Sequence, residues 1–597
     1  VETGTLMGSG TIVSSKASGG AALTVSNQNT FDALAVELLA ESGSEANDGK
    51  YTTEATSHAV SVTVGDITVN KVRTFNEMNT SLNVGAVSFI NGDSFSNAVI
   101  SAKNLTDSNA YIHSVNVGVA GSGNNFAQTH DKSNVSITVA AGTTGLNAKN
   151  LEINAINSGT VDAKAVGTDV GILEISPFAA RVEHESNSST TVNLSGKLNA
   201  SGELITNAQR NDTLNLMADA LSMTVAGGGD ATVKNNVVSN TNIKADGASL
   251  TSAGDLRLLA ANYVTTNNKE GFEQMIYGQG SGIIGDNTAG VDNEVRSEAK
   301  VAVNNSTLIS NNGAIDIAGY SNDNLKISGY IYSTGLISGC AANVENSVEN
   351  YNEVAVNNSI LKVNKTGKDL TLSAADDVKL NLYAYSEVSP AVNLANSTDA
   401  NITNVITRTN TIKVNGNSSL YSARDINLYA GKLLNGNVAT LDLDAEASDF
   451  NASLIPVVLD PTVDNAVTQN NQITIDNGSS SGSARHTNLY ADTGREMARI
   501  YSCRYTGWGS SDVDGGYVTT DSGQTMDNKT TNNYVNINGS VVAGVANKVD
   551  IIIGHTGDIV VLDDPVVPGF VSAERDAVVG VDGGALNNTT FTYDESK

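Results

Sequence analysis

A phrase that recurs about every 57 residues is the feature that most restricts how this chain can fold. The clearest copy is residues 300–318, and a second copy starts at Val354. Self-similarity at such a period indicates stacked structural units rather than independent globular domains. The equivalent strand starts lie 59, 55 and 56 residues apart, in the order Leu256, Ile315, Leu370, Ile426.

Each copy contains short stretches in which apolar residues alternate with polar ones. In the clearest copy these are 301–303, 307–310 and 315–317, separated by Asn-Asn and Asn-Gly pairs. Apolar residues two positions apart lie on one side of a strand, and Asn and Gly tolerate the positive φ angles of sharp corners. The pattern predicts an all-β fold, a parallel β-helix (β-solenoid) with three sides and about 20 residues per coil. About 30 such coils, rising about 4.8 Å each, would form a rod near 140 Å long.

A single coil cannot bury its apolar face alone, so we expect residues 1–597 to form one continuous solenoid. Asn residues at equivalent corners would form hydrogen-bonded ladders along the stack. The pattern is less regular at 1–130 and 555–597. Repeat-like sequence continues close to both ends without polar capping repeats, so we expect a longer solenoid of which this chain is a part. A string of immunoglobulin-like sandwiches would need a core Trp in each module, and Trp508 is the only one in the chain.

Composition and charge exclude several classes of partner. The formal net charge is −29 and no run of Lys or Arg interrupts the acidic surface, so we expect no nucleic acid partner. No hydrophobic run reaches transmembrane length, which argues against membrane insertion. Cys340 and Cys503 lie 163 positions apart, and neither belongs to a Cys-x-x-Cys pair. With 20-residue coils they would be about 40 Å apart, too far for a disulfide.

Two segments interrupt the alternation and are predicted to protrude, near 265–292 and near 501–530. Both contain aromatic residues beside Gly and Asp, a combination that could stack on sugar rings and accept their hydroxyl groups. An alternative is that these rings pack on the flank of the solenoid. The candidate contacts for a glycan or another partner are Tyr505, Trp508, Tyr517, Phe272 and Tyr277.

Residues with the spacing of a catalytic or metal site are missing from the sequence. The six histidines are isolated from one another, and no nucleophile elbow or phosphate-binding loop is present. The Asp-x-Asp-Gly fragment at 512–515 lacks the further ligands of a calcium loop. We therefore expect no enzyme activity, no catalytic residue, no metal and no cofactor.

Several phrases resemble the repeat region of leukotoxin-type filamentous adhesins, which are related to filamentous haemagglutinins. They are Ala-Arg-Val-Glu-His at 180–184, Thr-Thr-Val-Asn-Leu-Ser-Gly at 190–196, and Ala-Ala-Asn at 260–262 leading into Met-Ile-Tyr-Gly at 275–278. The resemblance implies type V secretion, an extracellular or bacterial cell-surface location, and a β-helical shaft that contributes to virulence. It further implies attachment to glycans or proteins of host cells or other bacteria. A second reading is a structural subunit that associates end to end into an extracellular filament or surface layer.

Overall fold

The computed structural model describes residues 2–4, 12–19, 22–25, 36–42, 51–63, 67–85, 97–143, 146–174, 178–266, 269–272, 274–388, 394–452, 455–458, 461–506, 517–520, 528–542, 549–554, 559–561 and 590–592. Within these ranges every regular element is a β-strand. The strands stack in parallel, so the predicted all-β parallel solenoid is confirmed.

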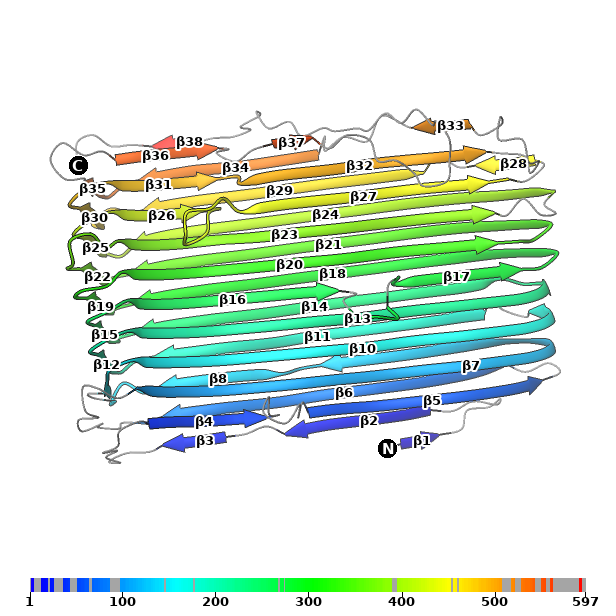
Figure 1. Ribbon diagram of the computed structural model, residues 1–597, viewed down its shortest axis with the longest axis horizontal. Helices are drawn as coiled ribbons and strands as arrows, with labels where there is room; N and C mark the ends of the chain where they lie inside the picture. Colours follow the sequence, from blue (N-terminus) through cyan, green and yellow to red (C-terminus); the bar gives the residue numbers. More distant parts are fainter. Residues whose placement is uncertain are drawn as a thin grey trace.

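One coil consists of two long strands and one short strand. The chain runs along β10 (Leu151–Glu174), returns along β11 (Phe178–Leu194) and turns through β12 (Lys197–Ala200). It then enters β13 (Leu204–Ala226), which lies parallel to β10 with Leu204 beside Leu151. Two broad sheets, here named face 1 and face 2, are thereby joined by a narrow short side, at the left of Figure 1.

Equivalent strands of successive coils make up each side. Face 1 contains β4 (Val36–Ser42), β5 (Tyr51–Thr63), the first part of β7 (Ala98–Asp131), β10, β13, β16 (Leu256–Thr266), β17 (Ile276–Ser281), β20 (Ile315–Ser333), β23 (Leu370–Val388), β26 (Ile426–Ala430), β27 (Thr440–Asn451), β31 (Thr487–Asp492), β32 (Arg495–Thr506), β36 (Val549–Gly554) and β37 (Ile559–Val561). Face 2 contains β2 (Ile12–Gly19), β3 (Ala22–Val25), β6 (Ile67–Val84), the remainder of β7, β8 (Asn134–Val139), β11, β14 (Gly229–Asp246), β18 (Ile284–Asn304), β21 (Ile337–Asn357), β24 (Ala395–Asn415), β28 (Ile455–Val458), β29 (Thr462–Ile475), β34 (Asn528–Ile537) and β38 (Thr590–Thr592).

The short side contains β9 (Leu146–Ala148), β12, β15 (Ser249–Ser252), β19 (Thr307–Ser310), β22 (Ile360–Val363), β25 (Ser419–Ser422), β30 (Ser480–Ser483) and β35 (Ser540–Val542). Two antiparallel pairs depart from the parallel stacking: β1 (Glu2–Gly4) pairs with β2, and β33 (Tyr517–Thr520) pairs with β32.

The predicted coil of about 20 residues is wrong, because one coil takes up the whole sequence period. Leu256 lies beside Ile315, Ile315 beside Leu370, and Leu370 beside Ile426, the same residues that recur in the sequence. About ten coils at about 4.8 Å give a height near 50 Å, and long strands of about 20 residues give a width near 65 Å. The molecule is therefore a flat slab and not a rod 140 Å long. Cys340 is a buried free thiol, and on this period it lies about three coils from Cys503 rather than eight.

Polar residues inside the long strands explain why the coil is longer than the sequence pattern predicts. Asn293 lies between Val291 and Val295 of β18, where an Asn usually indicates a corner, yet its side chain is buried within the sheet. Four successive side-chain amides at this position donate to the side-chain oxygen of the Asn in the next coil at 2.7–2.9 Å, which satisfies groups that would otherwise be costly to bury. The ladder runs through Asn235, Asn293, Asn346, Asn404 and Asn465.

Replacing Asn346 with alanine should lower the free energy of unfolding by about 2 kcal/mol, because a donor on Asn293 and an acceptor on Asn404 lose their partner inside the core. Denaturant unfolding followed by circular dichroism measures this cost. The matched control is Asn364→Ala, which breaks an exposed Asn–Asn pair with Asn311 and should cost less than about 0.5 kcal/mol. Equal costs for the two variants would contradict a stabilising role for the buried ladder.

The corners between face 2 and the short side follow the sequence prediction. Asn305, Asn358 and Asn417 adopt φ angles of 49°, 47° and 63° in three successive coils. A left-handed conformation is tolerated by Asn better than by most residues, so the recurring Asn at this position places the turn. The Asn-rich pairs thus specify these corners, whereas the Asn residues within the strands do not form corners.

The stacking continues through part of the segment expected to be less regular. Residues 51–63, 67–84 and 98–131 form β5, β6 and β7, which pair in register with one another. In the C-terminal part, β36 and β37 pair with β31 and β32. Residues 562–589 lie outside the described part of the chain. The described coils therefore form one continuous stack.

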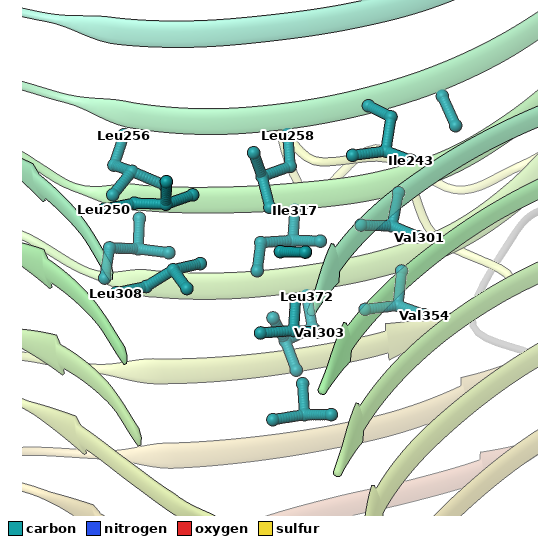
Figure 2. Close-up of a cluster of buried hydrophobic side chains, with 14 of the residues drawn as sticks. Ile243, Leu250, Leu256, Leu258, Val301, Val303, Leu308, Ile317, Val354 and Leu372 are labelled. Atoms are coloured by element: carbon teal, nitrogen blue, oxygen red, sulfur yellow. The ribbon is translucent and has the colours of Figure 1, made fainter. Parts of the chain in front are cut away.

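The core between the faces consists of two apolar clusters separated by a polar seam. Figure 2 shows part of the cluster near the short side, where Leu256, Leu258 and Ile317 of face 1 lie near Leu250 and Leu308 of the short side. The second cluster fills the part of the slab nearer the opposite edge. The seam that separates them carries buried charged and amide side chains at equivalent positions of successive coils, including Asn157, Arg210, Asp212, Asn262, Asp323, Asn350, Asp376 and Arg408.

Candidate functional site

An insertion on face 1 interrupts the repeat at residues 431–439. The register offset between β23 and the next coil is 56 residues at Ile426 but 63 at Leu441, so seven additional residues leave the sheet here. They form a small antiparallel turn in which Lys432 bridges Val438 and the amide of Gly436 donates to the carbonyl of Leu433. The excursion is visible between β26 and β27 in Figure 1.

Specific contacts hold this loop against the sheet. The Ser373 hydroxyl donates to the Lys432 carbonyl at 2.6 Å, and the Lys432 ammonium lies 4.6 Å from the ring centroid of Tyr490. Gly431 and Gly436 have φ angles of 89° and 81°, a conformation that glycine adopts without strain. The loop is therefore fixed against face 1 by its own side-chain and backbone contacts.

A polar pocket of about 430 Å³ lies on one side of the loop. Its lining contains three carboxylates and three cationic side chains, arranged as ion pairs: the Arg257 guanidinium is 2.8 Å from Asp255 and 3.4 Å from Asp316, and Arg424 pairs with Asp369. Burial raises the pKa of Asp316, whereas Arg257 lowers it. The lining is Asp255, Arg257, Ala314, Asp316, Gly367, Lys368, Asp369, Thr371, Arg424, Asn427, Tyr429, Leu434, Asn435 and Gly436.

An apolar groove of about 290 Å³ lies on the other side of the loop and shares Leu434 and Asn435 with the polar pocket. Tyr263 and Tyr320 form its aromatic part, with ring centroids 5.9 Å apart in an edge-to-face arrangement. The Tyr320 hydroxyl donates to Asp377 at 2.7 Å. Burial raises the pKa of Tyr320 and the Asp377 carboxylate raises it further, so this hydroxyl is a donor at neutral pH. The remaining lining is Leu259, Ala260, Ala261, Ala318, Ser373 and Leu433.

A tyrosine ladder lies farther along face 1 and includes Tyr277, one of the residues predicted to contact a glycan. Tyr277 stacks on Tyr330 at 5.2 Å, and Tyr330 stacks on Tyr385 at 5.0 Å, with nearly parallel rings. Both Tyr330 and Tyr385 donate a hydroxyl hydrogen bond to Glu387 at 3.0 Å. Stacking on Tyr330 covers one face of the Tyr277 ring and links successive coils, and the predicted contact of Tyr277 with a glycan stays a prediction.

Phe272 belongs to the first segment predicted to protrude, and its side chain is only 4% exposed. The segment folds back over face 1, where the Lys164 ammonium lies 5.5 Å from the Phe272 ring centroid and Lys269 pairs with Asp162. The protrusion is also shorter than 265–292, because β17 and β18 belong to the stack. Phe272 therefore does not belong to the candidate site.

The second predicted protrusion is described only in part. Tyr505 lies in β32 and Tyr517 in β33, and the two strands pair antiparallel with Tyr505 beside Val518. Trp508 lies outside the described residues. The contacts predicted for these three residues stay predictions.

The 431–439 loop was missed by sequence reasoning, although two signals were present. Asn435-Gly436 is a turn dipeptide, and the spacing of the repeat lengthens by seven residues at this point. The contacts between coils in the polar pocket had no sequence signal, because Arg257 and Asp316 come from two successive coils and Arg424 pairs with Asp369, 55 positions earlier.

Within the described ranges, no three His, Cys, Asp or Glu side chains are arranged to hold a metal ion. His184 is buried, and burial lowers its pKa to about 4. The described residues also contain no helix of the length and apolarity needed to cross a membrane. Comparison with family models, with curated proteins and with solved structures gave no match.

Proposed function

We propose that this chain is an adhesive module of an extracellular filamentous adhesin from a bacterial surface, and that it binds an uncharged saccharide beneath the 431–439 loop. The observation that carries the proposal is the loop itself, which departs from a regular repeat to frame a polar pocket beside an apolar groove. The stacking of coils does not require this inserted loop, so we assign it a role in binding.

The chemistry of the polar pocket favours a neutral polyol. Its three carboxylates and three cations balance one another, so an ionic ligand would gain no net charge attraction. Paired carboxylate and guanidinium groups still offer acceptors and donors to adjacent hydroxyl groups. The apolar groove next to it suits the apolar face of a sugar ring, for which Tyr263 and Tyr320 provide aromatic surface.

The slab shape gives the molecule a wide exposed face and a short length along the stacking axis. Each coil takes 52–62 residues for one step along the axis, as the pairs Leu204–Leu256 and Thr487–Val549 illustrate. A coil of 20 residues would extend about three times as far for the same chain length. A wide face that displays a binding loop fits an adhesive module better than it fits a long spacer.

Deleting residues 432–438 should weaken saccharide binding at least tenfold without unfolding the chain. The deletion removes the seven inserted residues and places Ala439 directly after Gly431, as in the coil before it. An array of neutral and anionic glycans identifies the ligand, and titration of that glycan against wild type and variant measures the loss. Replacing the same seven residues with Gly and Ser tests the side chains alone and should give a similar loss.

Three outcomes would contradict this site. One is wild-type binding restricted to anionic glycans, and another is unchanged binding in the deletion variant. The third is loss of binding on Trp508→Ala or Tyr505→Ala while the deletion variant binds normally, which would place the site in the 501–530 segment. Release of sugar from the bound glycan would contradict a purely adhesive role.

A further inference from the structure

The edge of the slab where face 1 passes into face 2 lies on the right of Figure 1. Exposed apolar side chains form a stripe along this edge. Aliphatic side chains on this edge are 41–56% exposed in one coil after another. Isolated exposed aliphatic residues are common on protein surfaces, but a contiguous row indicates an interaction surface. The stripe is Val117, Val119, Ile172, Met223, Val225, Ile283, Ile284, Ile337 and Leu394.

The stripe is continuous because its central members occupy equivalent positions of successive coils, with Val119 beside Ile172 at its start. Gly171 pairs with Thr224 and Leu173 with Ala226, which sets Ile172 beside Val225. The amide of Ile283 donates to the Val225 carbonyl at 2.9 Å, one coil farther along. The next two coils supply Leu336, half-buried, and Leu394, whose amide donates to the Leu336 carbonyl at 2.8 Å.

Charge on the stripe itself does not oppose the approach of a second copy. The chain has a formal net charge of −29, so most of its surface repels a second copy. None of the nine residues in the stripe is charged.

We propose that the stripe is a self-association surface, on which a second copy of this chain lies side by side with the first. The aliphatic side chains recur with the coil spacing of about 4.8 Å, and the stripe of another copy has the same spacing. Two such rows related by a two-fold axis interdigitate along their whole length. The association is lateral, unlike the end-to-end contact predicted from the sequence, and it is independent of saccharide binding.

The size of the stripe sets the strength of the contact. Nine half-exposed apolar residues present on the order of 700 Å² of surface per copy. A stable interface buries about 800 Å² per partner, and a single row is covered only in part by a second row, so the pair should be weak and reversible. Salt should strengthen it, because screening reduces the repulsion between two acidic chains.

Sedimentation velocity across a concentration series in low and high salt tests the proposal. The wild type should form a dimer at high concentration, and Ile172→Asp with Ile283→Asp should weaken dimerisation at least tenfold. The matched control is Val405→Asp with Ile360→Asp, which places two charges at aliphatic residues of 42% and 49% exposure on face 2 and the short side. This control should dimerise nearly as well as the wild type.

Mixing opposite charges distinguishes the stripe from other surfaces. An Ile283→Lys variant and an Ile283→Asp variant should each be monomeric alone and should pair when mixed, if stripe meets stripe. A monomeric wild type at all concentrations would overturn the proposal. So would association that survives the two stripe substitutions, which would place the contact at the solenoid ends, or a control that weakens dimerisation as much as they do.

Discussion

Arg210→Met should lower the free energy of unfolding by about 3–5 kcal/mol, because it leaves two carboxylates in the core without their cation. Arg210 is fully buried, and its guanidinium lies 3.0 Å from Asp131 of face 2 and in direct contact with Asp212 of face 1. Methionine fills a similar volume but carries no charge. Denaturant unfolding and hydrogen exchange of amides in β7 and β13 should both report the loss.

Two further variants separate the buried charge from simple packing. Combining Arg210→Met with Asp131→Asn and Asp212→Asn should restore most of the stability, because no uncompensated charge then remains in the seam. Arg181→Met removes a half-exposed ion pair with Asp230 at 3.6 Å and should cost less than about 1 kcal/mol. If Arg210→Met costs no more than Arg181→Met, the seam does not depend on its charges.

Asp323→Asn should stabilise the chain above neutral pH and change how its stability depends on pH. Burial raises the pKa of Asp323 to about 7; Asn350, Ser297 and Arg408 lower it, and the Asp376 carboxylate raises it further. The folded state therefore binds this proton more tightly than the unfolded state, in which the pKa is about 3.9. The stabilisation is complete below about pH 4 and is lost as the pH rises to about 7.

The expected loss over that interval is about 4 kcal/mol, at about 1.4 kcal/mol for each pKa unit. The asparagine variant lacks this component, so the difference in unfolding free energy between variant and wild type should grow in favour of the variant from pH 4 to pH 7. Urea titrations at several pH values measure the difference. Asp292→Asn, at an exposed carboxylate that pairs with Lys234 at 3.3 Å, should change stability by less than about 0.5 kcal/mol. A constant difference between Asp323→Asn and the wild type across the pH range would contradict the raised pKa.

The candidate site could be predicted only in part. The residues chosen from the sequence were aromatic rings in segments that leave the repeat, yet Phe272 is buried and Tyr277 is stacked on Tyr330. An aromatic residue beside Gly indicates surface position poorly, because rings gain more by packing than by exposure. The 431–439 loop contains no aromatic residue, and its role becomes visible only beside Tyr263 and Tyr320 of two earlier coils.

The apolar edge could not have been identified from the sequence either. Ile172, Val225 and Ile283 alternate with other residues as core residues do, and alternation alone does not say which side of a strand faces the core. They are exposed because they continue the outward-facing set of their strands, as Met223 and Val225 do in β13.

The sequence by itself determined that the strands stack in parallel and in which register. Leu256, Ile315, Leu370 and Ile426 lie one above another because only that register stacks the apolar positions of every coil. It also determined the corners at Asn305, Asn358 and Asn417. The tertiary structure alone decided the width of the coil and the pairing of Arg210 with Asp131, 79 residues earlier and on the opposite sheet. The physical reason is that an Asn or Asp in an alternating pattern can lie either at a corner or in a buried ladder. The local sequence is the same in both cases, and only the hydrogen-bond partner in another strand distinguishes them.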